Sequence, residues 1–262
     1  MLDDSRQLAA RLAEHWKSTR TGVVGLGGGQ GAGKSTLSRF IVEACSAVDL
    51  RCAVLSLDDY YLSRSEREEL AARVHPLFVT RGPPGTHDVE LCAEQLGALR
   101  LPGEVRIPVF DKGRDDRNGE RALRGPFDLV LLEGWCVGAR PQGAAALAEP
   151  VNALESERDP DGLWRRHVDA QLAGPYAALF AALEALVFLR VPSLAAVRRW
   201  RLQQEGERPP GRRLSAAQVD RFVQHYERVT LAMLEDLPGR ADVLVELDES
   251  HGVSGVRWGK RS

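Results

Sequence analysis

Short apolar runs alternate along this chain with longer segments in which apolar residues recur every three or four positions. The runs have the length of buried strands, and the recurring spacing is that of amphipathic helices. Strands that alternate with helices predict an α/β fold, with a mostly parallel sheet covered on both faces. The predicted strands are 23–26, 52–57, 127–132, 185–191 and 241–247, and helices are predicted over 3–19, from 34 onward, and over 64–73, 89–99, 161–184, 193–205 and 215–236.

A glycine-rich segment lies between the first predicted strand and the helix that starts at residue 34. Residues 28–35 fit G-x-x-x-x-G-K-[ST], the phosphate-binding P-loop, and a chance match of a glycine-rich loop is the alternative. Glycine lets the backbone curl so that its N–H groups and the following helix N-terminus face a polyphosphate. The segment predicts a three-layer fold of the P-loop NTPase type that binds a nucleoside triphosphate. The expected ATP-binding residues here are Gly28, Gly29, Gln30, Gly31, Ala32, Gly33, Lys34, Ser35 and Thr36.

Carboxylates follow two of the predicted strands. Asp58 follows 52–57, and Glu133 follows 127–132. Ligands of parallel sheets bind at the carboxyl ends of the strands, so both side chains are expected beside the phosphates. We expect Lys34 to neutralise the β- and γ-phosphates, and Ser35 and Glu133 to hold Mg²⁺, directly or through water. Asp58 is either the base that accepts the proton of an acceptor hydroxyl or a second Mg²⁺ ligand.

The irregular segment 75–88 carries several polar side chains. Two prolines and two glycines occupy 82–85, which excludes a helix or a central strand. Long loops of this kind are often binding loops. Asp88 at its end is also suited to cap the helix over 89–99. A short extended segment over 105–111 then leads into a charged stretch that is either part of the acceptor site or a solvated turn.

Arginines cluster in the segment 193–214, which we predict to be a lid. Arg198 and Arg201 lie three residues apart and share a helix face, and glycines and prolines interrupt the segment after them. Such arginines either close over ATP phosphates or form surface salt bridges.

Composition narrows the function classes. The chain has 262 residues, 44% of them apolar, and a net charge of −2, so no basic surface favours nucleic acid. Four cysteines without a C-x-x-C pair suggest reduced core thiols, and no apolar run is long enough to span a bilayer. The N-terminus has no signal-peptide core. We expect one cytoplasmic domain over 1–262, with acceptor loops at 58–88 and 105–120 and a loose tail over 248–262.

The motifs in order resemble the plant- and fungal-type D-glycerate 3-kinases. These in turn are similar to a wider group of P-loop kinases that includes uridine kinase, phosphoribulokinase and pantothenate kinase. The resemblance runs from about residue 20 to about 247. It rests on the P-loop and on Leu-Asp-Asp-Tyr-Tyr-Leu (57–62), Arg-Gly-Pro-Pro-Gly-Thr-His-Asp (81–88), Phe-Asp-Lys (110–112), Glu-Gly-Trp-Cys-Val-Gly (133–138) and Trp-Arg-Leu-Gln-Gln-Glu (200–205).

The resemblance implies an ATP- and Mg²⁺-dependent kinase whose acceptor is D-glycerate and whose product is 3-phosphoglycerate. The aspartate at the end of the second strand, here Asp58, is the base proposed for the wider group. A carboxylate acceptor suits a cationic clamp, for which Arg81 and Lys112 are the first candidates. The residues implied around the acceptor are Asp58, Tyr60, Arg81, His87, Asp88, Asp111, Lys112 and Arg117.

Two other functions remain open from the sequence. One is a kinase of another small alcohol, such as a nucleoside, a sugar or a pantothenate-like compound. The other is a nucleotide-dependent switch whose hydrolysis of ATP drives a partner protein. The guanine-reading motif of GTPases and the signature of transporter ATPases are both absent from the chain.

Overall fold

A six-stranded sheet forms the centre of the computed structural model, which describes residues 2–206 and 213–259. The strand order is β2-β5-β1-β6-β7-β8. All neighbouring strands are parallel except β7 and β8. The α/β prediction is therefore confirmed. The strands are β1 Val23–Gly28, β2 Cys52–Ser56, β5 Leu129–Gly134, β6 Ala185–Arg190, β7 Val243–Leu247 and β8 Val253–Trp258.

Helices cover both faces of this sheet and create two hydrophobic cores. The first core is formed with α1 (Leu2–Thr19), α2 (Lys34–Ala47) and α8 (Leu194–Gly206). The second is formed with α3 (Arg64–Arg73), α4 (Val89–Ala98), α6 (Leu163–Ala173) and α7 (Pro175–Ala181). The long helix α9 (Ala216–Asp236) contributes apolar side chains to both cores. The arrangement is the three-layer architecture expected from the sequence.

A second, two-stranded sheet stands apart from the central one. Its strands β3 (Gly103–Asp111) and β4 (Asp116–Gly125) are antiparallel. The Arg121 guanidinium on β4 donates a 2.9 Å hydrogen bond to the carbonyl of Val54, which ties this hairpin to β2. The sequence predicted an extended segment over 105–111 but not its pairing with β4.

Three segments differ from the sequence predictions. The helix expected over 161–184 is two helices, α6 and α7, because Pro175 has no N–H to continue the first. The connection 138–160 contains the short helix α5 (Ala153–Arg158), whose Glu155 is buried and paired with Arg228. In the tail expected to be loose over 248–262, Val253–Trp258 form β8, which pairs with β7, and residues 260–262 lie outside the described residues.

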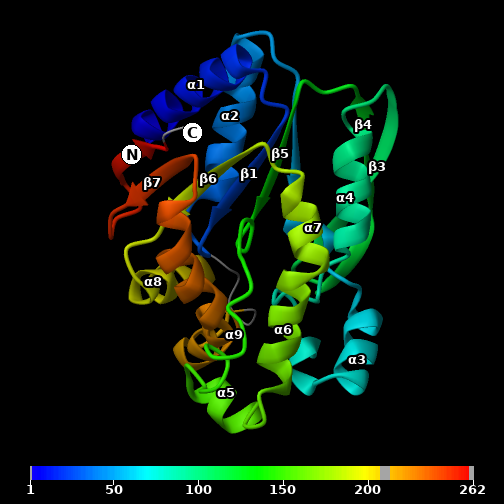
Figure 1. The fold of residues 1–262 in the computed structure, drawn as a ribbon, viewed down its shortest axis with the longest axis vertical. Coiled ribbons are helices and arrows are strands. Elements are labelled where there is room, and N and C mark those ends of the chain that lie inside the picture. The colour runs from blue at the N-terminus through cyan, green and yellow to red at the C-terminus, as the bar shows by residue number, and fades with distance from the viewer. Residues whose placement is uncertain (1, 207–212, 260–262) are drawn as a thin grey trace.

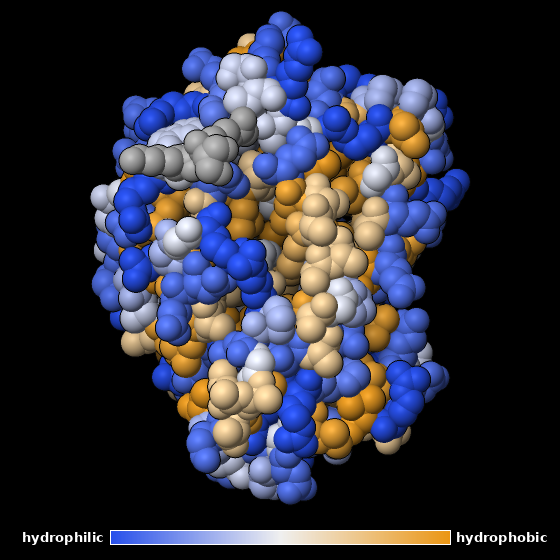
Figure 2. Space-filling view, in the orientation of Figure 1, coloured by the Kyte–Doolittle hydropathy of each residue, from blue (hydrophilic) through white to orange (hydrophobic). Residues whose placement is uncertain are grey.

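Figure 1 shows the sheet in the upper part of the molecule and α3, α5, α6 and α9 in the lower part. The carboxyl ends of β1 and β5 point into the middle, between these two parts. On the same face, hydrophilic residues cover most of the periphery, while apolar residues gather over α7 (Figure 2). None of the helices in the described part of the chain is long and apolar enough to cross a membrane.

Candidate active site

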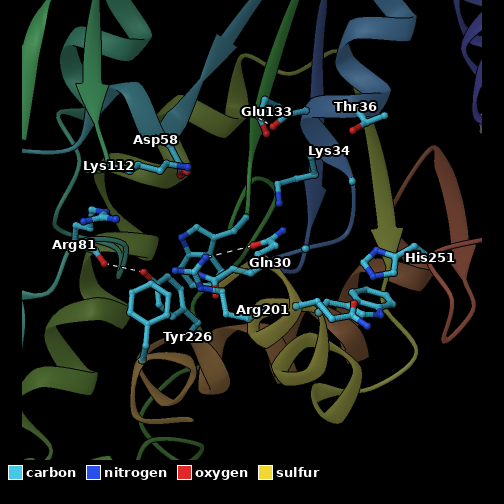
Figure 3. Close-up of a pocket in the computed structure, with 18 of the residues that line it drawn as sticks. Gln30, Lys34, Thr36, Asp58, Arg81, Lys112, Glu133, Arg201, Tyr226 and His251 are labelled. Atoms are coloured by element: carbon cyan, nitrogen blue, oxygen red, sulfur yellow. Dashed lines mark hydrogen bonds and ion pairs between the residues drawn. The ribbon is translucent and has the colours of Figure 1, made fainter. Parts of the chain in front are cut away.

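A cavity of about 520 Å³ opens at the carboxyl ends of β1, β2 and β5. Figure 3 shows Asp58, Lys112 and Arg81 on one side of it and Lys34, Thr36 and His251 on the other. Most of its polar side chains come from the predicted motifs. It is lined by Gln30, Gly31, Gly33, Lys34, Ser35, Thr36, Asp58, Tyr61, Arg81, Lys112, Glu133, Trp135, Trp200, Arg201, Gln203, Gln204, Phe222, Tyr226 and His251.

The P-loop joins β1 to α2 at one end of this cavity. Gly33 caps α2 with a φ of 81°, a left-handed conformation that favours glycine. The Lys34 ammonium donates hydrogen bonds to the carbonyls of Gly28 at 2.9 Å and Gly29 at 3.1 Å. Burial lowers the pKa of Lys34, and the nearby carboxylates of Glu133 and Asp58 oppose this shift. The Lys34 side chain therefore folds back onto the P-loop, and it lines the cavity.

Glu133 lies beside the start of α2 because β5 pairs with both β1 and β2. Its Oε1 atom accepts hydrogen bonds from Ser56 Oγ at 2.7 Å and from Ser35 Oγ at 3.4 Å. The side chain is buried, and these hydroxyls satisfy one of its oxygens. Glu133 and Ser35 are thus brought together, as the sequence predicted.

Asp58 follows β2 and faces the cavity from a short 3₁₀ turn, Leu57–Tyr60. Its Oδ1 atom accepts a 2.8 Å hydrogen bond from the Tyr61 hydroxyl, and its Oδ2 atom is paired with the Lys112 ammonium. Burial by itself raises the pKa of Asp58. The charge of Lys112 and the hydrogen bonds from Lys112 and Tyr61 outweigh it and lower the pKa to about 2.

Arg81 supplies a second cation to the same side of the cavity. Its guanidinium is paired with Asp115, which also accepts a 2.9 Å salt bridge from the buried Arg67. Trp135 Nε1 donates a 2.9 Å hydrogen bond to the carbonyl of Gly82, the next residue along. A Cβ atom at Gly82 would lie 2.1 Å from the Tyr226 hydroxyl, so only glycine fits there.

Two predicted acceptor residues point away from the cavity. Tyr60 is fully buried, and its hydroxyl donates a 2.8 Å hydrogen bond to Gln95 Oε1. The sequence analysis assigned Tyr60 to the acceptor site, but the neighbouring Tyr61 is the tyrosine that lines the cavity. His87 is also buried, with Nδ1 2.5 Å from the Tyr176 hydroxyl, and burial lowers its pKa to about 4. It supports the cavity wall rather than lining it.

Three other charged residues of these loops, Asp88, Asp111 and Arg117, form hydrogen bonds with the backbone, and two of them pair with each other. Asp88 caps α4 through a 3.1 Å hydrogen bond from Leu91 N, and Arg117 lies 3.3 Å from its other oxygen. Arg117 also donates to the carbonyl of Tyr61 at 3.0 Å. Asp111 accepts hydrogen bonds from the backbone N–H groups of residues 113 and 114 and so closes the turn between β3 and β4. Among the described residues, the side chains that line the cavity do not include these three.

The two arginines of the predicted lid have different surroundings. Arg198 forms salt bridges with Asp220 at 3.0 Å and Glu227 at 3.1 Å on α9 and does not line the cavity, so the surface-pair interpretation fits it. Arg201 lines the cavity and is paired with Glu205 at 2.6 Å. Residues 207–212 of the predicted lid lie outside the described residues.

Sequence reasoning missed the aromatic walls of the cavity. Trp200 on α8 and His251 after β7 lie with their ring centroids 3.9 Å apart. Trp135 and Tyr226 meet edge to face at 4.9 Å. Trp135 lies two residues after Glu133, so its place near the cavity could have been predicted from the sequence. Tyr226 and His251 lie far from the predicted motifs in the sequence, and no local pattern indicates their place.

The fold and the cavity define a nucleotide-binding protein of the P-loop class, with a phosphate-binding loop, two strand-end carboxylates and a cationic wall. No family model matches the chain. The uncharacterized kinase mug58 of Schizosaccharomyces pombe is 32% identical over 219 residues, which are 78% of each chain. This relative shows the family: the chain belongs to the P-loop kinases, and it is an ATP-dependent phosphotransferase.

The chloroplastic D-glycerate 3-kinase of Arabidopsis thaliana is 30% identical over 219 residues. The match covers 78% of this chain and 46% of the plant enzyme, so the chain spans about half of that protein. A solved structure of D-glycerate 3-kinase from Cryptococcus neoformans has a TM-score of 0.78 at 24% identity. It covers 99% of both chains, and at this identity it shows the shared fold.

Proposed function

We propose that this kinase transfers the γ-phosphate of ATP to a hydroxyl of D-glycerate and forms 3-phosphoglycerate. One observation carries the proposal: Asp58 and the two cations Lys112 and Arg81 share a cavity with the P-loop lysine. A small hydroxy acid needs a base for its hydroxyl and cations for its carboxylate. The relatives named as D-glycerate 3-kinases support this choice of acceptor.

We propose that the ATP polyphosphate binds over the P-loop, with Lys34 near the β- and γ-phosphates. Arg201 is the candidate to contact phosphate from α8, since it lines the same cavity. The residues fit a Mg²⁺ ion held by the Ser35 hydroxyl and, directly or through water, by Glu133. No group of three or more acidic, histidine or cysteine side chains among the described residues is arranged to hold a metal, so phosphate oxygens and waters would supply the remaining ligands.

We propose Asp58 as the base for the acceptor. The acceptor oxygen forms a bond to the γ-phosphorus while the bond from phosphorus to the β-phosphate oxygen breaks, and the hydroxyl proton passes to Asp58. During this transfer, Lys112 and Arg81 neutralise the carboxylate of the bound acceptor. We also propose that residues 1–262 act as one kinase domain, in which the described part of the predicted lid, 193–206 and 213–214, closes over the nucleotide.

An acceptor panel tests this function. ADP release from Mg²⁺-ATP is measured with D-glycerate, L-glycerate, uridine, pantothenate and ribulose 5-phosphate. Release that depends on D-glycerate supports the proposal. Release with another acceptor would keep the nucleotide site but reject glycerate, and release without any acceptor, stimulated by a partner protein, would favour a switch.

A further inference from the structure

The two contacts of the Asp58 carboxylate differ in how firmly they are held. Tyr61 is 4% exposed, and its ring lies 4.6 Å from the His87 ring and 5.0 Å from the Phe110 ring. The Lys112 side chain is 55% exposed. Tyr61 is therefore a fixed partner of Asp58 Oδ1, whereas the ammonium at Oδ2 can be replaced at little structural cost.

The turn that carries Lys112 is rigid although the side chain is not. Asp111 Oδ1 accepts hydrogen bonds from Gly113 N at 2.8 Å and from Arg114 N at 3.2 Å. The backbone on either side of Lys112 is thus held in place at the cavity. A lysine bears its charge on a flexible four-carbon chain, so the ammonium can move while the turn stays fixed.

Arg81 differs from Lys112 because its counter-ion is shared. Asp115 is paired with Arg81 and with the buried Arg67, so these three side chains have a net charge of +1. Asp58 and Lys112, in contrast, form a neutral pair. An incoming anion therefore meets one fixed cationic group and one cation that is already occupied by Asp58.

We propose that Lys112 is an exchangeable counter-ion, which leaves Asp58 for the carboxylate of the acceptor and thereby frees Oδ2 for the acceptor's hydroxyl. This inference rests on the proposed function. An uncharged acceptor does not attract Lys112 away, so Oδ2 stays occupied and proton transfer is poor. Lys112 then selects anionic acceptors by controlling the base as well as by binding the anion.

Other charged and titratable groups also surround Asp58, and they do not share the position of Lys112. Lys34 is held by the P-loop carbonyls, and Asp59 receives a hydrogen bond from Phe110 N. Burial lowers the pKa of His87 and raises that of Cys136, so these two groups remain neutral near pH 7. Among the described residues, the groups that interact electrostatically with Asp58 include Lys34, Asp59, Tyr61, His87, Lys112, Cys136 and Tyr226.

Calorimetric titration with D-glycerate tests the exchange without relying on turnover. The proteins are the wild type, Asp58→Asn, Lys112→Met and the double variant, each first shown to melt cooperatively, with Asp58→Ala as a second neutral variant. Asp58→Asn should bind D-glycerate about threefold to tenfold more tightly than the wild type, because Lys112 no longer has a competing partner. Glycerol, which has the hydroxyls but no carboxylate, should show no such gain.

The Lys112→Met background separates exchange from simple repulsion. If Asp58 only repels the acceptor's carboxylate, the gain from Asp58→Asn persists without Lys112, and that result overturns the proposal. Loss of the gain in the double variant supports it. Wild-type binding of D-glycerate with no gain in Asp58→Asn or Asp58→Ala overturns the exchange alone. Absence of binding by every variant overturns the proposed function as well.

Discussion

The hydroxyl of Tyr226 on α9 donates a 2.8 Å hydrogen bond to the backbone carbonyl of Arg81, a residue 145 positions earlier in the chain. Trp135, which follows β5, binds the next carbonyl, that of Gly82. Two aromatic donors from separate elements thus fix consecutive peptide groups beside the Arg81 side chain. This contact links the helix that contributes to both cores with the loop that faces the acceptor end of the cavity.

Replacement of Tyr226 by Phe should weaken acceptor binding. The variant keeps the aromatic ring but loses the hydrogen bond to Arg81, so the loop becomes less ordered, at a cost of about 1 kcal/mol. We expect the KM for the acceptor to rise about threefold to tenfold while the KM for ATP changes little. Steady-state kinetics with each substrate varied in turn measures both values.

Tyr60→Phe is the matched control for this substitution. Its hydroxyl binds Gln95 in the core, outside the cavity. The loss should lower the melting temperature, because Gln95 loses a buried hydrogen-bond partner, and should leave both KM values unchanged. An acceptor KM that rose as much in Tyr60→Phe as in Tyr226→Phe would mean that the loop is not specifically held by Tyr226.

Glu133→Gln should increase the Mg²⁺ concentration needed for half-maximal activity by about tenfold to a hundredfold. The amide keeps the hydrogen bonds to Ser35 and Ser56 but removes the charge that attracts the metal or its water. A Mg²⁺ titration at fixed ATP measures the effect. Glu43→Gln, which alters an exposed pair with Arg6, is the control, and equal behaviour of the two variants would refute the metal role of Glu133.

Lys34→Ala should abolish measurable phosphoryl transfer, because the positive charge at the β- and γ-phosphates is lost. Lys17→Ala removes a lysine from the exposed side of α1 and should retain full turnover. An ADP-release assay with both variants checks this. Normal turnover by Lys34→Ala would show that the P-loop lysine takes no part in phosphoryl transfer.

Asp58 should also affect the stability of the protein in acid. Its pKa is lowered from 3.8 to about 2, so the folded form gains stability above pH 4 and loses it as the pH falls from 4 towards 2. Between pH 5 and pH 3 this loss is about 1 kcal/mol, by the linkage relation. Asp58→Asn should therefore lose about 1 kcal/mol less over that range in urea unfolding. An identical pH dependence of the two proteins would show that the Lys112 pair does not hold the carboxylate in solution.

The sequence was sufficient for the parts of the fold and site that depend on local order. Strand–loop–helix at the P-loop, and the carboxylates Asp58 and Glu133 after buried strands, were placed correctly because strand ends of a parallel sheet meet at one edge. The break between α6 and α7 also has a local signal, because Pro175 has no N–H to continue a helix. The pairing of β8 with β7 depends on backbone hydrogen bonds, which the local sequence does not predict.

The direction of individual side chains was the harder part. Tyr60 and Tyr61 are adjacent, and the 3₁₀ turn that ends at Tyr60 sends one ring into the core and the other to the cavity. Asp111 and Lys112 are also adjacent, and the turn uses the carboxylate for its own backbone while it presents the ammonium. These side-chain directions follow from tertiary packing, which the sequence alone does not show.

Phosphoryl transfer to D-glycerate can be observed by ³¹P NMR of the reaction products. The purified protein is incubated with Mg²⁺-ATP and D-glycerate, with Lys34→Ala as the inactive control. We expect one new phosphomonoester signal that matches authentic 3-phosphoglycerate and grows in step with ADP. A spectrum in which ATP yields only inorganic phosphate would refute this assignment, and so would ATP that stays unchanged with D-glycerate while a parallel reaction phosphorylates another alcohol.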